Sequence, residues 1–246
     1  MVHLAALADA AICEKFPEEA RSINLDGTRN VLRALSGADV RRFVFVSSSF
    51  VYGDFLCDPA DEEHPCRPET VYGKVKLAGE ELTARECENR GIQYVIVRPS
   101  AVYGYGDANP RVASLFLRNA RLGRPLVVKG GGAERLDFSY IEDMTAGLVL
   151  ALFEEKGRDQ VFNLTRGEGR TVLELARAVQ GEFPGAELAV TAAVEEVRRP
   201  VRGALDIRKA RRLLGYAPRF ALEDGIAAYA AELRQRGLPE VGVPPT

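Results

Sequence analysis

The chain has 246 residues, enough for one large domain or two small ones. Its 33 basic and 35 acidic residues give a net charge of −2, and this near balance argues against a nucleic-acid-binding protein, which needs concentrated positive charge. Hydrophobic residues make up 46% of the chain and charged residues 28%, so we expect a buried core, and no apolar run reaches the roughly 18 to 20 residues of a membrane span.

The N-terminal two thirds of the chain alternate between predicted strands and predicted helices. Continuous apolar, β-branched and aromatic runs predict strands buried on both faces at Arg42–Val46, Gln93–Val97, Leu126–Lys129 and Gln160–Leu164. Helical spacing of apolar residues, closed by glycines, predicts helices at Pro17–Leu35 and Glu69–Asn89. This alternation predicts an α/β fold with a parallel sheet.

The last third changes character and contains shorter elements. Thr171 and Glu174 form a capping box at the start of a predicted helix over 171–179. Asp206 is expected to cap a short basic helix that ends at Gly215, and a final helix is predicted over 221–236. We therefore expect a smaller C-terminal lobe that sits on the α/β part.

The cysteine pattern bears on location and on metal binding. The four cysteines, at positions 13, 57, 66 and 87, show no C-x-x-C spacing. We expect reduced thiols in a cytoplasmic protein, and neither a disulfide framework nor a metal site. The first residues carry no basic segment ahead of their apolar stretch, so no secretory signal is expected.

Tyr72 and Lys76 stand in a Tyr-x-x-x-Lys pattern on the predicted helix over 69–89. Residues four apart share one face of a helix, so the phenol and the ammonium are expected side by side. A tyrosine becomes a useful general base only if its pKa falls from about 10, and a neighbouring ammonium favours the phenolate. The alternative is a solvated helix face, because such a pair can arise by chance.

A run of serines, Ser47 to Ser49, follows the Arg42–Val46 strand directly and leads into Val51-Tyr52-Gly53. In doubly wound sheets, ligands bind at the carboxyl ends of the strands, where a serine can donate a hydrogen bond to a substrate oxygen. The alternative is an ordinary polar strand end. The combination of strand, serines, Val-Tyr-Gly and a later Tyr-x-x-x-Lys helix favours the functional interpretation.

This combination resembles the NAD-dependent epimerase/dehydratase family, the extended short-chain dehydrogenases/reductases. Other segments are similar to motifs of the family and follow in the family's order: 2–6 (VHLAA), 24–32 (NLDGTRNVL), 98–104 (RPSAVYG), 137–143 (DFSYIED), 214–218 (LGYAP) and 223–226 (EDGI). The resemblance implies a Rossmann-like doubly wound parallel sheet in residues 1–165. It also implies a substrate-binding lobe formed mainly by residues 166–246, with 107–145 contributing in part.

The resemblance also implies a chemistry for the site. Tyr72 would be the general acid/base, Lys76 would lower its pKa and hold the nicotinamide ribose, and Ser48 would orient the substrate hydroxyl. Hydride transfer to NAD or NADP would give a 4-keto intermediate, which is then reduced from its other face or loses water. The residues implied to line the cofactor, besides Tyr72 and Lys76, are Leu4, Ala5, Ala6, Asn24 and Pro99.

The chain departs from the family at its N-terminal side. A dinucleotide needs a glycine-rich turn before a helix, and residues 1–246 hold none, because Gly130-Gly131-Gly132 lies deep in the chain and is interpreted as a turn. We therefore expect an N-terminally truncated sheet, with an open edge and an uncovered apolar face beside residues 2–4. Two explanations stay open: a fragment of a complete enzyme, or a cofactor-deficient remnant.

Two further departures concern the substrate. Nucleotide-sugar members of the family often carry Asn where this chain has Ala101, and Arg where it has Leu136. Ser48 and Ser49, together with Arg135, Arg199 and Arg202, are the candidate substrate-binding residues, since arginines bind diphosphates by paired hydrogen bonds. A solvated loop is the alternative for the arginine cluster.

Three functions therefore remain in view. The first is an NAD(P)-dependent epimerase or dehydratase of a nucleotide-sugar. The second is a related reductase that acts on a non-nucleotide substrate, motivated by Ala101 and Leu136. The third is a non-catalytic binding protein. By analogy with the family, we expect a homodimer formed through the two long helices, and no nucleic-acid or membrane partner.

Overall fold

The computed structural model of the protein describes residues 1–107, 111–192 and 200–239. Its larger part contains a four-stranded sheet in the order β1-β2-β3-β7, in which every neighbouring pair is parallel. The strands are β1 (Val2–His3), β2 (Arg42–Val46), β3 (Gln93–Arg98) and β7 (Gln160–Asn163). This sheet confirms the predicted α/β class with parallel strands.

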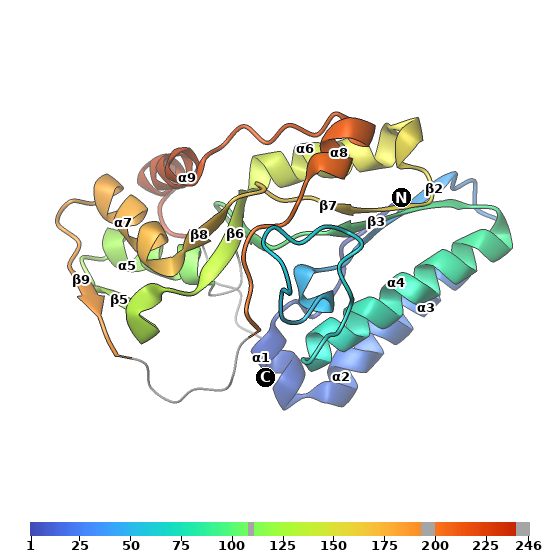
Figure 1. Ribbon diagram of the computed structural model, residues 1–246, viewed down its shortest axis with the longest axis horizontal. Helices are drawn as coiled ribbons and strands as arrows, with labels where there is room; N and C mark the ends of the chain where they lie inside the picture. Colours follow the sequence, from blue (N-terminus) through green and yellow to red (C-terminus); the bar gives the residue numbers. More distant parts are fainter. Residues whose placement is uncertain (108–110, 193–199, 240–246) are drawn as a thin grey trace.

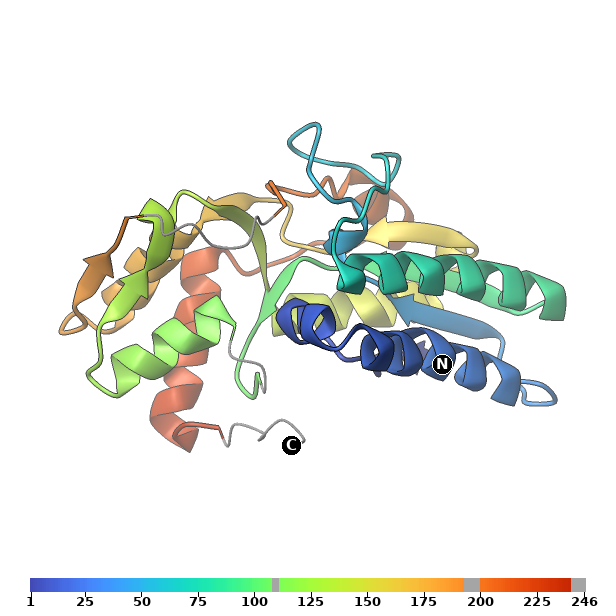
Figure 2. The same ribbon diagram turned by 90° about the horizontal axis from the view of Figure 1, so that it is seen from below.

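Helices cover both faces of this sheet, as the apolar runs require (Figure 1). On one face lie α3 (Gly27–Ala34) and α4 (Val71–Arg90), which run side by side (Figure 2). On the other lie α6 (Ile141–Phe153) and the short α8 (Arg208–Leu214). Because α8 packs against α6 and β7, the C-terminal segment contributes to both parts of the molecule.

The helix predicted over Pro17–Leu35 is divided into three consecutive segments. They are α2 (Pro17–Arg21), a π-helical turn (Ser22–Asp26) and α3, and they follow α1 (Ala10–Lys15). In the π-helical turn the amide of Gly27 donates to the carbonyl of Ser22, one residue further back than in an α-helix. Such single turns occur mostly at functional sites, and this one holds Asn24.

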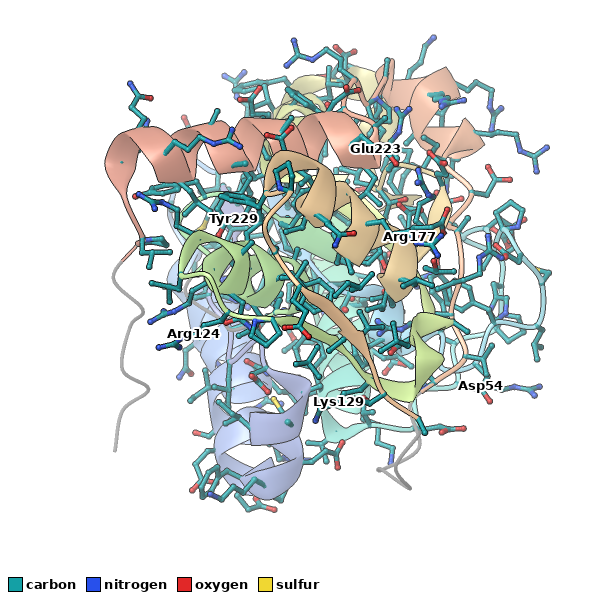
Figure 3. All side chains as sticks on the ribbon, turned by 90° about the vertical axis from the view of Figure 1, so that its left-hand side faces the viewer. Asp54, Arg124, Lys129, Arg177, Glu223 and Tyr229 are labelled. Atoms are coloured by element: carbon teal, nitrogen blue, oxygen red, sulfur yellow. The ribbon has the colours of Figure 1, made fainter. Side chains whose placement is uncertain are left out.

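The smaller lobe is built on two other sheets (Figure 1). One has the order β4-β6-β8 and the other pairs β5 with β9; the strands are β4 (Ala101–Tyr103), β5 (Leu126–Val128), β6 (Arg135–Tyr140), β8 (Gly169–Thr171) and β9 (Leu188–Val190). The helices of this lobe are α5 (Val112–Arg121), α7 (Val172–Glu182) and α9 (Leu222–Arg236). Figure 3 faces this lobe, and the buried Tyr229 of α9 belongs to its core.

The sequence interpretation of β5 was wrong in one respect. Its apolar run was expected to be buried on both faces, yet Val127 is 42% exposed, and among the described residues β5 pairs with β9 alone. Three apolar residues are too few to separate a central strand from a two-stranded ribbon, because the choice depends on a partner far along the chain. The glycines 130–132 form the expected turn, with positive φ at each.

Strand β1 forms one outer edge of the central sheet, as expected. The apolar side chains next to it in the chain are exposed, Met1 by 47% and Leu4 by 62%, as are Val149 and Phe153 of α6, by 51% and 71%. That these side chains form one uncovered face beside residues 2–4 stays a prediction. No helix in the described part of the chain is long and apolar enough to cross a membrane.

Candidate active site

Ser48 stands at the carboxyl end of β2, where the chain turns into a 3-10 segment (Ser49–Val51). It is the N-cap of that segment: its hydroxyl accepts from the amide of Phe50 at 3.3 Å, and its side chain is largely buried. The amide of Ser49 donates to the carbonyl of Pro99 at 2.8 Å, which joins this turn to the end of β3. Two neighbouring strand ends thereby fix the position of Ser48.

Tyr72 lies in the first turn of α4, which begins where Thr70 caps the helix by accepting from the amide of Gly73 at 3.1 Å. A Cβ atom at Gly73 would lie 2.6 Å from the carbonyl oxygen of Phe50, so only glycine lets the helix pack this closely on the serine turn. As a result, the Tyr72 ring meets Phe50 edge-on at 5.5 Å. The Tyr72 hydroxyl also comes close enough to the Ser48 side chain for Ser48 to lower the pKa of the phenol.

Lys76 follows one turn along the same helix and is 5% exposed. Its Nζ donates to the carbonyl of Val46 at 2.8 Å, and it lies 5.9 Å from the centre of the Tyr72 ring. Burial lowers the pKa of Lys76 to about 8, although Cys13 and Glu80 act in the opposite direction. The structure therefore brings Ser48, Tyr72 and Lys76 together, as the sequence predicted for their positions.

The acidity of Tyr72 differs from the expectation. Burial raises the pKa of the phenol above its ordinary value, while the Ser48 side chain and the charge of Arg111 lower it less strongly. The Lys76 ammonium is directed at the backbone carbonyl of Val46, and the expected lowering of the Tyr72 pKa by Lys76 is not seen. Desolvation of a phenolate in an apolar site outweighs a cation that is itself hydrogen-bonded elsewhere.

The residues implied to line a cofactor fall into two groups. Leu4 and Ala5 are exposed just after β1, Ala6 is half-buried, and Pro99 is half-buried. Asn24, by contrast, is 3% exposed, and its amide is occupied: it accepts from the amide of Leu7 at 2.7 Å and donates to the carbonyl of Leu7 at 3.1 Å. The side chain of Asn24 therefore holds the segment after β1 in place, and its implied role beside a cofactor stays a prediction.

The candidate substrate-binding residues differ in burial and in their partners. Ser49 is 1% exposed, and its hydroxyl meets no hydrogen-bond partner among the described residues, so it lies behind the site surface. Arg135 forms an ion pair with Asp58 and donates to the carbonyl of Gly169 at 3.1 Å. Arg202 lies 3.6 Å from a Glu134 carboxylate oxygen and stacks on the ring of Phe50 at 4.5 Å.

Arg199 lies outside the described residues. Arg135 and Arg202 line a cavity of about 500 Å³, together with Phe55, Asp58 and Glu134 among others. Ser48, Phe50 and Tyr72 are not among the residues that line it, and the link between the cavity and the Ser48–Tyr72 pair is Phe50, whose ring contacts both Arg202 and Tyr72.

Two features of the site escaped the sequence interpretation. Arg111, just before α5, is close enough for its charge to lower the pKa of Tyr72. Arg98 forms a buried ion pair with Glu80. Neither has a local signal, because each partner lies on a different element. In the described ranges, no group of three or more His, Cys, Asp or Glu side chains is placed to hold a metal ion.

A comparison with protein families decides the relationship. The sequence model of the NAD dependent epimerase/dehydratase family matches residues 1–165, about two thirds of the chain. The chain belongs to this family. A similar relative is a putative UDP-glucose 4-epimerase of Methanocaldococcus jannaschii, 32% identical over 92% of this chain and 74% of its own length. UDP-glucuronic acid decarboxylase 4 of Arabidopsis thaliana is 31% identical, and the match covers 95% of this chain but 54% of that relative.

Solved structures of family members have the same fold. The UDP-glucose 4-epimerase of Thermotoga maritima, solved with UDP-glucose, has a TM-score of 0.88 at 26% identity and covers 95% of this chain and 76% of its own. The UDP-glucuronic acid 4-epimerase of Bacillus cereus, in complex with UDP-glucuronic acid and NAD, has a TM-score of 0.85 at 29% identity, covering 95% and 75%. The Rossmann-like class predicted from the sequence is therefore confirmed.

Proposed function

We propose that this protein is an NAD(P)-dependent epimerase/dehydratase that acts on a nucleotide-sugar, with Tyr72 as general acid/base. The observation that carries the proposal is the packing of Tyr72 against the serine turn, with its ring 5.5 Å from that of Phe50 and Lys76 Nζ 5.9 Å from its centre, in a chain of this family. We further propose that residues 1–165 form the cofactor-binding domain and that residues 166–246 form most of the substrate-binding lobe, to which 107–145 also contribute.

The chain's residues supply proton transfer and orientation. Ser48 would hold the reacting hydroxyl of the sugar by a hydrogen bond, next to the phenol of Tyr72. As the carbon is oxidised, Tyr72 takes the hydroxyl proton, and it returns this proton when the keto group is reduced again. The Lys76 ammonium stabilises the phenolate when its Nζ turns from Val46 toward the site.

The site fits the nicotinamide end of a dinucleotide. Lys76 uses one N–H on Val46, which leaves donors for ribose hydroxyls, and the exposed small side chain of Ala5 leaves open space beside the end of β1. A bound nicotinamide would accept and return the hydride. Family members solved with NAD or NADPH support this assignment. Leu4, Ala6 and Pro99 are proposed to line the same space.

A nucleotide-sugar substrate is supported by the relatives' printed activities and by the arginines beside the cavity. One observation favours the second candidate, a reductase of a non-nucleotide substrate. Arg135 already pairs with Asp58, and Arg202 already lies beside Glu134, so a diphosphate would have to displace carboxylates. We also propose a cytoplasmic homodimer that joins through α4 and the helical segment that ends in α3; Ile23, in the π-helical turn before α3, is 50% exposed.

The test is conversion of UDP-glucose, UDP-glucuronic acid and dTDP-glucose in the presence of NAD or NADP. Tyr72→Phe is expected to lower kcat by roughly 10²- to 10⁴-fold, because the proton acceptor is lost while the ring still packs on Phe50. Tyr94→Phe is the matched control and should keep full activity, because Tyr94 lies near the N-terminal end of β3, away from the carboxyl end that joins the serine turn. Equal turnover in Tyr72→Phe and the parent would reject the proposal.

A further inference from the structure

A buried polar network lies behind the site, centred on Arg98 at the end of β3. Its guanidinium donates to both carboxylate oxygens of Glu80, from Nε at 2.9 Å and from Nη2 at 2.6 Å. Nη1 donates to the hydroxyl of Tyr52 at 3.1 Å. The two charged side chains are 7% and 5% exposed, and Tyr52 is fully buried. Such a pair is tolerated in the interior only where its geometry is held on all sides.

The network continues from Tyr52 to β7. The Tyr52 hydroxyl donates to Oδ1 of Asn163 at 2.7 Å, and Nδ2 of Asn163 donates to the carbonyls of Ala60 and Asp206, each at 3.2 Å. A hydroxyl that accepts from Arg98 and donates to Asn163 has a fixed orientation. The chain of contacts thus crosses from α4 through the loop after Tyr52 to the segment that precedes α8.

Both ends of the network that face the site belong to elements that carry catalytic candidates. Glu80 follows Lys76 by one turn and Tyr72 by two turns of α4. Tyr52 ends the 3-10 segment whose N-cap is Ser48. The side chains of Arg98, Glu80 and Tyr52 are all buried, so their contribution to a reaction would be indirect. Arg98 on β3 binds both Glu80 of α4 and the hydroxyl of Tyr52, so the network links the two elements that carry Tyr72 and Ser48.

We propose that Arg98, Glu80 and Tyr52 are positioning residues, which hold α4 against the serine turn so that Tyr72 reaches Ser48. This inference rests on the proposed function for its effect on catalysis. Tyr52→Phe is the smallest change that interrupts the network, because it removes only the hydroxyl and keeps both the ring and the Arg98–Glu80 pair. Tyr103→Phe is the matched control, since the buried Tyr103 hydroxyl donates to the carbonyl of Leu222 at 3.3 Å in the smaller lobe.

The first readout is kinetic. Tyr52→Phe is expected to lower kcat for the nucleotide-sugar by roughly ten- to a hundred-fold, as a small misplacement of the acid/base does, while KM stays within about two-fold. Tyr103→Phe should leave both constants as in the parent. An unchanged kcat in Tyr52→Phe, or an equal loss in both variants, overturns the proposal.

The second readout needs neither substrate nor cofactor. In the ligand-free protein with ¹³Cζ-labelled tyrosine, the Tyr72 resonance, assigned by its loss in Tyr72→Phe, should move in Tyr52→Phe and stay in place in Tyr103→Phe. Arg98→Lys keeps a cation beside Glu80 but loses the fork that also reaches Tyr52, and it should move the same resonance. A Tyr72 resonance that stays in place in both network variants overturns the proposal. If the parent converts no nucleotide-sugar, the proposed function fails while this measurement still decides on the network.

Discussion

The two sides of the candidate site hold their charges in opposite ways. On the side of the parallel sheet, the Lys76 ammonium is buried and meets a backbone carbonyl, and no carboxylate in the described ranges lies within ion-pair distance of it. On the side of the smaller lobe, Arg135 is partly exposed and already paired with Asp58. The first arrangement costs stability and leaves a donor for chemistry; the second is close to neutral for stability and must be rearranged to bind an anion.

Some of the buried polar groups that lack a hydrogen-bond partner lie at the catalytic strand ends, and others lie elsewhere in the described residues. The hydroxyls of Ser47 and Ser49 are buried with no hydrogen-bond partner among the described residues. Directly behind them, the Arg98–Glu80 pair is fully satisfied. The contrast indicates that unmet polar groups at the strand ends are supported by a rigid polar layer, an arrangement suited to a site that a ligand completes.

The largest expected effect separates the buried ion pair from the exposed one. Glu80→Gln leaves the Arg98 charge without its counter-ion in the interior and should lower the free energy of unfolding by about 3–5 kcal/mol. Arg135→Met breaks the pair with Asp58 where water screens it, and should cost less than about 1 kcal/mol. Urea unfolding at pH 7 measures both; similar losses would remove the distinction between the two sides.

A second substitution tests whether burial of the Lys76 ammonium lowers the stability of the folded protein. Burial lowers its pKa from 10.5 to about 8, which at about 1.4 kcal/mol per unit corresponds to about 3 kcal/mol of destabilisation at pH 7. Lys76→Met removes the charge but also the bond to Val46, so we expect a gain of about 1–2 kcal/mol in stability, accompanied by loss of activity.

The lowered pKa of Lys76 also predicts how the stability of the protein changes with pH. Between pH 8 and 10.5 the unfolded chain binds more protons at Lys76 than the folded chain, so stability of the parent rises with pH in this window. The Lys76→Met variant should lack that rise. Urea unfolding at pH 7 and pH 10 makes the comparison, and a variant that is less stable than the parent at both values contradicts it.

The sequence predicts contacts between residues that are close along the chain better than contacts between distant segments. Tyr72 and Lys76 share one helix, so their spacing predicts that they lie together, whereas Ser48 is chosen among three serines at a strand end by its resemblance to the family motif. The Arg98–Glu80 pair joins β3 to α4, and Arg135–Asp58 joins β6 to a distant loop, so their formation depends on the tertiary fold.

Asn24 shows a different limit. Its position in the motif is readable from the sequence, but the π-helical turn directs its amide to the backbone of Leu7, and that turn leaves no signature in residue types. The partners of β5 and the state of Arg111 beside Tyr72 were missed for the same physical reason, since both are set by segments far apart along the chain.

The smallest expected effect compares two helix caps of the same chemistry. Thr70 begins α4 and accepts from the amide of Gly73, whereas Thr171 begins α7 and shares a capping box with Glu174. Thr70→Ala and Thr171→Ala should each lower stability by about 1 kcal/mol. Only the first should also lower kcat, because fraying of the first turn of α4 displaces Tyr72 from Ser48, while α7 carries no catalytic candidate. A loss of kcat in Thr171→Ala equal to that in Thr70→Ala would mean that the two parts of the molecule are coupled more tightly than their separate sheets indicate.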